Sequence, residues 1–272
     1  MIGKLVSLPK ISIVVPSYNK ADYIRFTLQS IIDQKYPNLE VIIQDGESTD
    51  GTVKIIKEFA NKYPKIFLWS SKRDKGQVDA INTGLNHASG SIITFINADD
   101  IYDMNALTEV GTYFLNNPET PWLIGFGNII NTKGESISSV VTDYKNFLLS
   151  INNFNLLLII NYISQPSVFL SAKTYKNFGP FTGTNKYVME YALWLKIGRI
   201  HMPVIIKRNL SSFRLTMDNI SATLYYELLN LDYHIANDFT NNPIILIFHR
   251  LHNLSRVGLI SVLKLYEKFL AK

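Results

Sequence analysis

The segment Ser91–Asp100, with the sequence SIITFINADD, joins an apolar stretch to two adjacent carboxylates. Its apolar residues are typical of a β-strand that is buried on both faces, as in a parallel sheet. Asp99 and Asp100 follow directly, although like charges repel when they lie side by side. Such a pair is tolerated where a cation neutralises it, so the segment predicts a buried strand that ends at a ligand site.

The residues before this segment alternate between apolar stretches and amphipathic ones. We predict helices with one apolar face over Ala21–Gln34, Ser48–Tyr63 and Gln77–Ala88. Continuous apolar strands separated by such helices indicate a parallel sheet that is covered on both faces. The predicted strands before Ser91 are Ile11–Pro16, Leu39–Asp45 and Ile66–Ser70. The fold class is therefore α/β, with right-handed crossovers.

Polar side chains collect where the predicted strands end. In sheets of this kind, ligands bind in the crevice outside the carboxyl ends of the strands. Three of the four ends carry an acid, and the third end also carries two basic residues. Aspartate and asparagine form turns as well, which would explain any one position, but the set as a whole favours a binding site. The ends are Pro16–Asn19, Asp45–Ser48, Ser71–Asp74 and Asn97–Asp100.

The pattern becomes less regular after Asp100. We predict one or two strands over PWLIGFGNII, a hairpin turn at NTKGES and a late strand at VIIKRN. The main domain is expected to end near residue 220, and a helical basic extension follows over 221–272. Helices are predicted at Met104–Leu115, Asn155–Ile163, Lys173–Phe178 and Glu190–Ile197, and from Ala222 onward with a break near NNP.

The composition excludes several classes of protein. The chain has 272 residues, is 47% hydrophobic and has no cysteine, which excludes disulfides, thiolate metal sites and a cysteine nucleophile. No apolar run has the roughly 18 residues of a membrane-spanning helix, and no secretory signal is visible, so we expect a cytoplasmic protein. The glycine-rich loops of P-loop NTPases and of dinucleotide-binding oxidoreductases are absent from the sequence.

The net charge of +5 is concentrated at the end of the chain. Residues 243–272 contain five basic residues and one acid, Glu267, while the rest of the chain is nearly neutral. A nucleic-acid-binding protein more often spreads basic residues over its main surface, so we expect no nucleic-acid partner. The basic residues are Arg250, Arg256, Lys264, Lys268 and Lys272.

The last residues of the chain also show a helical period. Apolar residues recur at 257, 260, 263, 266 and 270, next to the lysines, which predicts an amphipathic basic helix. Such helices bind anionic membrane surfaces, and we expect a peripheral position on the inner face of the plasma membrane. Packing against the main domain and a contact in a homo-oligomer are the alternatives.

Four segments follow one another at characteristic separations: VVPSYNKADYIRFTLQSI, LEVIIQDGESTDGT, DKGQVDAINTGLNHASGSIITFINADD and YVMEYALWLKIG. Together they resemble the family 2 inverting glycosyltransferases, which use nucleotide sugars in bacterial polysaccharide and glycoconjugate assembly, and the resemblance covers about residues 11–217. It implies the GT-A fold, a Rossmann-like, mostly parallel central sheet flanked by helices. The catalytic domain would then span 1–220, with a nucleotide-binding half at about 10–100 and an acceptor half at 101–220.

The resemblance also implies an activity. A hexosyltransferase-like enzyme of this family moves a sugar from a nucleotide-diphosphate sugar to an acceptor hydroxyl with inversion, and UDP is the favoured nucleotide. Mg²⁺ or Mn²⁺ is the expected cofactor. The expected acceptor is a lipid-linked or surface-glycan intermediate. The apolar stretch Leu156–Ile159 either faces a lipid-linked acceptor or belongs to the ordinary core.

Roles for individual residues follow from the same resemblance. Pro16 and Tyr18 would wall the base pocket, and Asp45 would bind the base or the ribose. Asn97, Ala98 and Asp99 would lie against the donor where the family has its Asp-any-Asp metal motif. Asp99 is therefore the expected metal ligand, whereas Asn97 brings no charge. Gln77, Asp79 and Asn82 match the segment that borders the donor.

Three further positions complete the expected site. Glu190 matches the first of two acids that many relatives carry before Leu-Trp, so it is the candidate general base. Arg214 would contact the diphosphate. Thr216 stands where relatives have a histidine that reaches the metal, and a hydroxyl is a poor ligand, so we expect weak metal binding without donor. Without the resemblance, Glu190 would be interpreted as an exposed helix residue.

Two other functions are weighed against this one. Asn97, Ala192 and Thr216 depart from the family pattern, and they favour a catalytically weak or inactive homologue that binds sugar nucleotides. A nucleotidyltransferase would share the need for nucleotide and metal. It would also require a glycine-rich loop with basic residues after its first strand, and this sequence has none there.

Overall fold

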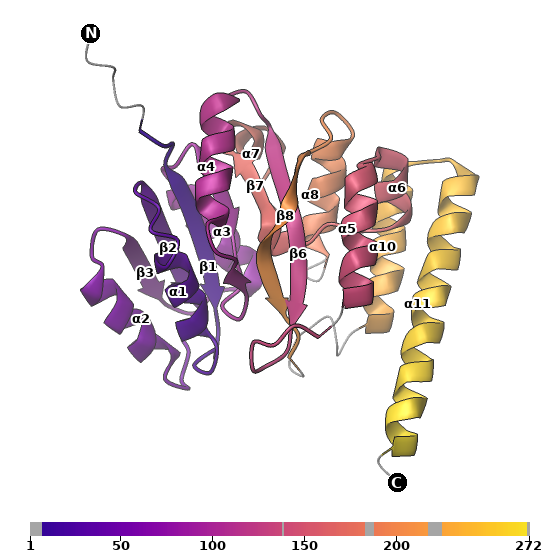
Figure 1. Cartoon of the computed structure of the whole chain (residues 1–272), viewed down its shortest axis with the longest axis horizontal. Helices are drawn as coiled ribbons and strands as arrows, with labels where there is room; N and C mark the ends of the chain where they lie inside the picture. Colours follow the sequence, from indigo (N-terminus) through magenta and orange to yellow (C-terminus); the bar gives the residue numbers. More distant parts are fainter. Residues whose placement is uncertain (1–6, 138, 183–187, 217–224, 271–272) are drawn as a thin grey trace.

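The computed structural model describes residues 7–137, 139–182, 188–216 and 225–270; the side chains of 139, 225–228 and 257–270 are outside that description. These residues form an eight-stranded sheet with helices on both faces (Figure 1). The strands are β1 Ile11–Ser17, β2 Leu39–Asp45, β3 Phe67–Ser71, β4 Ile92–Phe95, β5 Ile101–Tyr102, β6 Trp122–Ile130, β7 Val168–Ser171 and β8 Val204–Arg214. The α-helices are α1 Ile24–Ile32, α2 Thr52–Lys62, α3 Gln77–His87, α4 Ala106–Asn116, α5 Ser139–Ile151, α6 Phe154–Ile159, α7 Ala172–Phe178, α8 Met189–Gly198, α10 Tyr225–Phe239 and α11 Pro243–Leu270.

The sheet is mostly parallel, with the strand order β3-β2-β1-β4-β7-β6-β8-β5. β1 pairs in parallel with β2 and β4, and β2 pairs in parallel with β3. β7 lies antiparallel between β4 and β6, whereas β8 runs parallel to β6 and antiparallel to the short β5. The predicted α/β fold with a mostly parallel central sheet is therefore confirmed.

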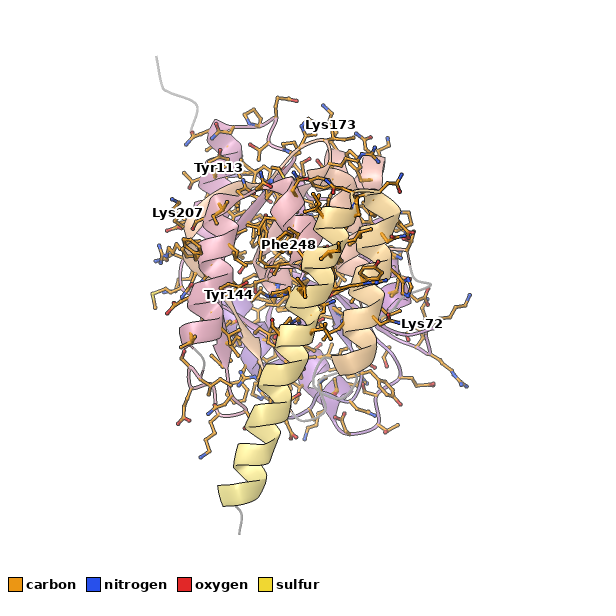
Figure 2. The ribbon with its side chains drawn as sticks, turned by 90° about the vertical axis from the view of Figure 1, so that its right-hand side faces the viewer. Lys72, Tyr113, Tyr144, Lys173, Lys207 and Phe248 are labelled. Atoms are coloured by element: carbon orange, nitrogen blue, oxygen red, sulfur yellow. The ribbon has the colours of Figure 1, made fainter. Side chains whose placement is uncertain are left out.

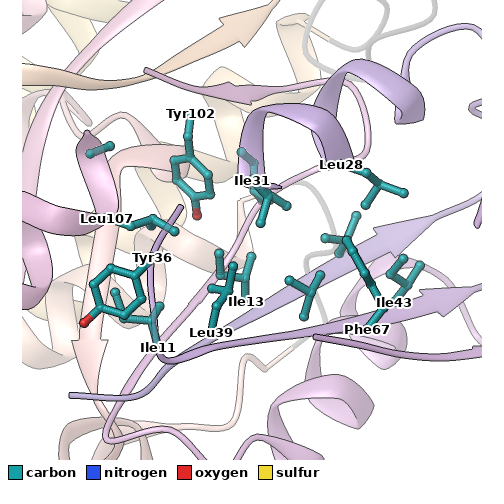
Figure 3. Close-up of a cluster of buried hydrophobic side chains, with 14 of the residues drawn as sticks. Ile11, Ile13, Leu28, Ile31, Tyr36, Leu39, Ile43, Phe67, Tyr102 and Leu107 are labelled. Atoms are coloured by element: carbon teal, nitrogen blue, oxygen red, sulfur yellow. The ribbon is translucent and has the colours of Figure 1, made fainter. Parts of the chain in front are cut away.

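Apolar residues of β1 are buried on both faces of the sheet. Ile13 and Val15 belong to one apolar cluster and Val14 to the other, and none of the three is exposed. Helices α1, α2 and α4 contribute to the first cluster, part of which is drawn in Figure 3. Helices α3, α5, α6, α8, α10 and α11 contribute to the second. Burial on both faces explains why this strand is a continuous apolar run and does not alternate.

One predicted turn is confirmed, and several elements were missed. The hairpin turn expected at NTKGES brings Ser136 back against Ile130 of β6 in an antiparallel bridge, and the Asn131 N–H donates to the Glu135 carbonyl oxygen at 2.9 Å. The chain then enters α5, which we did not predict. Tyr144 and Phe147 of α5 are exposed, so this helix lacks the polar outer face by which a surface helix is recognised. β5 and β7 are too short to show a period.

The described residues after the sheet form two helices, α10 and α11, as predicted, while the predicted helix start at Ala222 lies outside the described residues. α10 and α11 pack against each other and against α6, and the expected break near NNP is the loop between them. Within the described ranges, no helix combines the length and the apolar character that crossing a membrane requires. The apolar positions 257–270 lie in α11, but their side chains are outside the described part of the chain.

Candidate active site

The carboxyl ends of β1, β2 and β3 stop at the same level of the sheet. Ser17 pairs with Asp45, and Asp45 pairs with Ser71, while Pro16 is one residue inside the edge. Tyr18, the next residue after β1, is 64% exposed. A Cβ atom on Gly46 would come within 3.3 Å of the Tyr18 ring, so the glycine lets that ring lie over the end of β2. The ring offers an open aromatic face of the kind that stacks on a nucleotide base.

Asp45 fixes the loop that follows β2. Its side chain is buried and accepts hydrogen bonds from the Ser48 backbone N–H at 3.0 Å, the Ser48 hydroxyl at 2.5 Å and the Ser71 hydroxyl at 2.6 Å. In this loop, Glu47 has a positive φ of 67°. A carboxylate has about four acceptor positions, so Asp45 keeps capacity for one donor from a ligand.

Lys20 joins the first strand end to the fourth. Its ammonium group lies 2.7 Å from Asp99 Oδ2, and the Asp99 side chain is only 8% exposed. The Lys20 backbone is held in turn by the Thr52 hydroxyl at the start of α2, at 2.8 Å. This lysine could not be predicted, because its partner lies 79 residues away and no local pattern marks the pair. Asp99 is therefore neutralised by a cation that belongs to the chain.

Asp100 faces the interior, unlike its neighbour. It is fully buried, accepts from the Arg214 backbone N–H at 2.8 Å and from the Asn97 amide at 3.2 Å, and burial together with Asp99 raises its pKa well above the ordinary value. Asn97 Oδ1 in turn accepts from the Gln77 amide at 2.7 Å. The two adjacent acids thus have different partners: Asp99 pairs with the Lys20 ammonium group, and Asp100 joins the end of β4 to β8.

Arg214 is buried, and its guanidinium group makes its contacts within the protein. Its guanidinium group donates to the carbonyl oxygens of Asp99, Asn131 and Thr132, and it lies over the rings of Tyr23 and Phe26. These contacts tie the Asp99 backbone to the end of β8. The expected contact with a diphosphate stays a prediction.

Three other predicted donor-binding residues make contacts within the protein. Asp79, in the first turn of α3, accepts from the Lys75 backbone N–H at 3.1 Å, which ties the preceding loop to the helix. Asn82 bonds to both the N–H and the carbonyl of Phe181 and accepts from the Tyr175 hydroxyl. Ala98 is 1% exposed and belongs to the apolar cluster. Their roles toward a donor stay predictions.

The described residues do not fit a resident divalent cation. Across the described ranges, no group of three or more histidine, aspartate or glutamate side chains is arranged to hold a metal. One oxygen of Asp99 is taken by Lys20, and both oxygens of Asp100 are bonded inside the protein. The Thr216 hydroxyl is buried and has no hydrogen-bond partner, and a neutral hydroxyl is a poor metal ligand. We therefore derive no step through a metal.

Glu190 lies at the same end of the sheet. α8 runs antiparallel to β8, to which residues 199–203 connect it, so its first turn lies toward the carboxyl ends of the strands (Figure 1). Glu190 occupies that first turn and is half-buried. Burial, and less strongly the Asp232 carboxylate, raise its pKa to about 7. The adjacent Tyr191 donates to the carbonyl oxygens of Leu157 and Leu158, which fixes α8 against α6.

Asp232, whose charge acts on Glu190, belongs to a group of charged residues that was not predicted. Asp232 of α10 lies 3.9 Å from Arg256 of α11, and burial raises its pKa to about 7 despite that arginine and Lys145. Burial lowers the pKa of Lys145, on α5, to about 8. The group is assembled from three separate helices, so no spacing in the sequence could reveal it.

Comparison with known proteins finds a matching family and related glycosyltransferases. Residues 12–152, more than half of the chain, match the family described as Glycosyl transferase family 2. UDP-Glc:alpha-D-GlcNAc-diphosphoundecaprenol beta-1,3-glucosyltransferase WfgD of Escherichia coli is 28% identical over 247 residues, 89% of this chain and 91% of that one. Dolichyl N-acetyl-alpha-D-glucosaminyl phosphate 3-beta-D-2,3-diacetamido-2,3-dideoxy-beta-D-glucuronosyltransferase of Methanococcus voltae is 35% identical over 136 residues, 48% of this chain and 42% of that one.

Solved structures share the fold at low sequence identity. Mannosyltransferase PcManGT of Pyrobaculum calidifontis, in complex with GDP-Man and Mn²⁺, has a TM-score of 0.66 at 18% identity, over 97% of this chain and 83% of that one. TarS 1–349 of S. aureus, in complex with UDP-GlcNAc, has a TM-score of 0.58 at 18% identity, over 83% of this chain and 66% of that one. The predicted GT-A fold is thereby confirmed. The chain belongs to glycosyl transferase family 2 and is a glycosyltransferase.

Proposed function

We propose that this chain transfers a sugar from a nucleotide-diphosphate sugar to an acceptor hydroxyl with inversion at the anomeric carbon. The observation that carries the proposal is Glu190, a half-buried carboxyl with a pKa of about 7 at the sheet end where Asp45 and Asp99 lie. A general base works best when its pKa is near the working pH. An ordinary exposed glutamate would have no reason to show such a pKa.

The donor would occupy the edge formed by the first four strands. Tyr18 would stack on the base, and Asp45 would accept a hydrogen bond from the base or ribose. The diphosphate would then lie toward Asp99, where Lys20 supplies a positive charge. UDP remains the favoured nucleotide, which is consistent with WfgD, named for UDP-Glc, and with the UDP-GlcNAc complex of TarS.

The chemical step needs one base and one departing group. The acceptor oxygen attacks the anomeric carbon, and the bond from that carbon to the diphosphate oxygen breaks on the opposite side. The nucleoside diphosphate leaves with the bonding electrons, and the acceptor proton passes to Glu190. Attack opposite the leaving group inverts the anomeric carbon. Lys20 is placed to compensate the charge that develops on the departing diphosphate.

The acceptor is proposed to be a lipid-linked glycan intermediate. WfgD is named for a diphosphoundecaprenol acceptor, and the Methanococcus voltae relative for a dolichyl phosphate acceptor. Mg²⁺ or Mn²⁺ would have to take most of its ligands from the donor phosphates, because the chain offers one partly engaged carboxylate at Asp99.

A donor screen with a matched variant tests the proposal. UDP, GDP and dTDP sugars are incubated with a lipid-linked acceptor, and release of nucleoside diphosphate is measured for wild type and Glu190→Gln. We expect one donor class to be turned over, and the variant to keep its thermal stability and its donor-induced thermal shift while losing turnover. Donor binding without turnover by the wild type would instead support the inactive sugar-nucleotide-binding homologue, which the departures at Asn97, Ala192 and Thr216 favour.

A further inference from the structure

The surface formed by α5 and the first half of α11 is rich in exposed apolar side chains. In the described part of the chain, ten of the eighteen exposed large apolar side chains lie on these two helices. We name this surface the α5–α11 face. It consists of Val140, Tyr144, Phe147 and Ile151 on α5, and of Ile244, Ile247, Phe248, Leu251 and Leu254 on α11.

The two helices expose these residues on the same side. Each set recurs at intervals of three and four residues, which places it on one face of its helix. The opposite faces are buried, through Leu149 on α5 and Ile245 on α11. The rings of Tyr144 and His252 stack at 6.4 Å between the helices. In Figure 2, α5 and α11 lie in front, with Tyr144 and Phe248 labelled on them.

The face is larger than an ordinary apolar patch. Its side chains are between 44% and 79% exposed. A large apolar side chain has a solvent-accessible area of roughly 200 Å², and about half of that area is exposed on each residue of the face. The exposed apolar area of the whole face is therefore on the order of 1,000 Å². The largest apolar patch on a typical monomer is about 300–600 Å², and larger ones mark interaction surfaces. The α5–α11 face is therefore expected to have a partner.

The charges along α11 decide between the two main kinds of partner. Residues 243–272 contain five basic residues and a single acid; Arg250 lies over the Tyr233 ring and Arg256 near Asp232, so the excess positive charge comes from Lys264, Lys268 and Lys272, which follow the face in the sequence. A second copy that docked through the same face by two-fold symmetry would bring two such basic helices together, and like charges across an interface are unfavourable. An anionic lipid surface attracts the same residues. Helices with an apolar stripe and basic neighbours bind at the boundary between headgroups and acyl chains.

We propose that the α5–α11 face lies on an anionic lipid bilayer, with its apolar side chains at the level of the headgroups. The apolar contact with the bilayer is thereby placed on α5 and the first half of α11. The apolar residues of the segment 257–270 are not required for this contact. The proposal goes beyond the transfer reaction and does not depend on it.

This position would also bring the candidate base close to the membrane. Lys145 of α5 and Arg256 of α11 lie on the inner side of the same helices, where they interact with Asp232 beside Glu190. The charges of Lys145, Arg256 and Asp232 thus connect the helices of the α5–α11 face with the surroundings of Glu190. A sugar carried on a lipid diphosphate would reach the site from the headgroup level.

Vesicle flotation of the full chain tests the proposal. Phosphatidylcholine vesicles with and without phosphatidylglycerol are compared for wild type and for the double variant Phe147→Glu/Phe248→Glu. We expect the wild type to float with the anionic vesicles, and binding by the variant to fall by about tenfold or more, because two large apolar side chains are replaced by charges. The matched control is Met104→Glu/Ile200→Glu, which alters two exposed apolar residues outside the face and should bind as wild type does.

Three results would overturn the proposal. In the first, the wild type does not float with anionic vesicles. In the second, the control loses as much binding as the face variant. In the third, the wild type sediments as a dimer that only the face variant dissociates, while flotation is unchanged, which would assign the face to a second copy. Circular dichroism and donor turnover in solution, measured on the same samples, separate a folding defect or a failure of the transfer reaction from a failure of membrane binding.

Discussion

The pairing of Lys20 with Asp99 leads to a specific prediction about metal binding. Asp99 Oδ2 accepts from the Lys20 ammonium at 2.7 Å, so a divalent cation must displace the lysine before it can use both carboxylate oxygens. Replacement of the lysine by methionine keeps the apolar stem and removes the charge. Lys20→Met should therefore bind Mn²⁺ more tightly than wild type when no nucleotide is present.

The size of the effect follows from the burial of the pair. Two unit charges 4 Å apart attract by roughly 4 kcal/mol at the effective dielectric near a protein surface. Side-chain exposures of 26% for Lys20 and 8% for Asp99 leave some screening, so only part of that attraction opposes the metal. We expect a gain in Mn²⁺ affinity of about tenfold, which corresponds to about 1.4 kcal/mol. Stability should fall by about 1–2 kcal/mol, because a largely buried carboxylate loses its partner.

Calorimetric titration of Mn²⁺ into the nucleotide-free protein measures the affinity. Arg25→Met is the matched control, because it removes the same charge from α1, and the Arg25–Glu58 pair is about half exposed at both ends. Its Mn²⁺ affinity should equal that of wild type. An equal gain in both variants would mean that net charge alone governs binding. Tight Mn²⁺ binding by the nucleotide-free wild type would refute the reasoning altogether.

Three further predictions concern Glu190, Asp232 and Asn82. Glu190 must be ionised to accept a proton, so kcat/KM should rise with pH to a plateau above about 7, and Glu190→Gln should lower it at least about 100-fold; a profile without this step would exclude Glu190 as the base. The raised pKa of Asp232, about 7, means that its ionisation destabilises the folded state as pH rises from about 4 to about 7. Urea unfolding should therefore show Asp232→Asn gaining up to about 3 kcal/mol relative to wild type across that window, and no change in the difference would contradict the raised pKa. Asn82→Ala loses its bonds to Phe181 and Tyr175, so it should lower stability by about 2–3 kcal/mol and leave donor affinity unchanged in titration with nucleotide sugar, whereas the reverse result would assign Asn82 to the donor site.

The first hundred residues were predictable because their strands are buried on both faces. β2 begins and ends at the residues predicted, Leu39 and Asp45, and its apolar residues Leu39, Val41, Ile42 and Ile43 are all buried. α3 begins at Gln77 as predicted, directly after Gly76, which has a positive φ of 106°. In this half of the chain, local pattern and tertiary burial agree.

α5 could not be predicted for the opposite reason. Helix prediction relies on an apolar face turned inward and a polar face turned outward. In α5, Val140 and Phe147 are exposed while Thr142 is buried, so the pattern is partly inverted. The same inversion makes this surface a candidate for contact with lipid. The exposed apolar side chains of α5 thus explain why the helix was not predicted, and they also form part of the surface that we propose to contact lipid.

The partners of the site residues could not be predicted from the sequence either. The chain predicts that Asp99 and Glu190 stand at functional positions, but it does not show that Lys20 neutralises the first or that Asp232 lies beside the second. Ala192 removes the second acid that many relatives carry in α8, and the Asp232 carboxylate reaches the surroundings of Glu190 from α10. The helices α10 and α11 therefore influence the ionisation of the candidate base through Asp232 and Arg256. It follows that the helical extension is part of the environment in which the base works, and that removal of these helices would alter the chemistry along with any contact with a membrane.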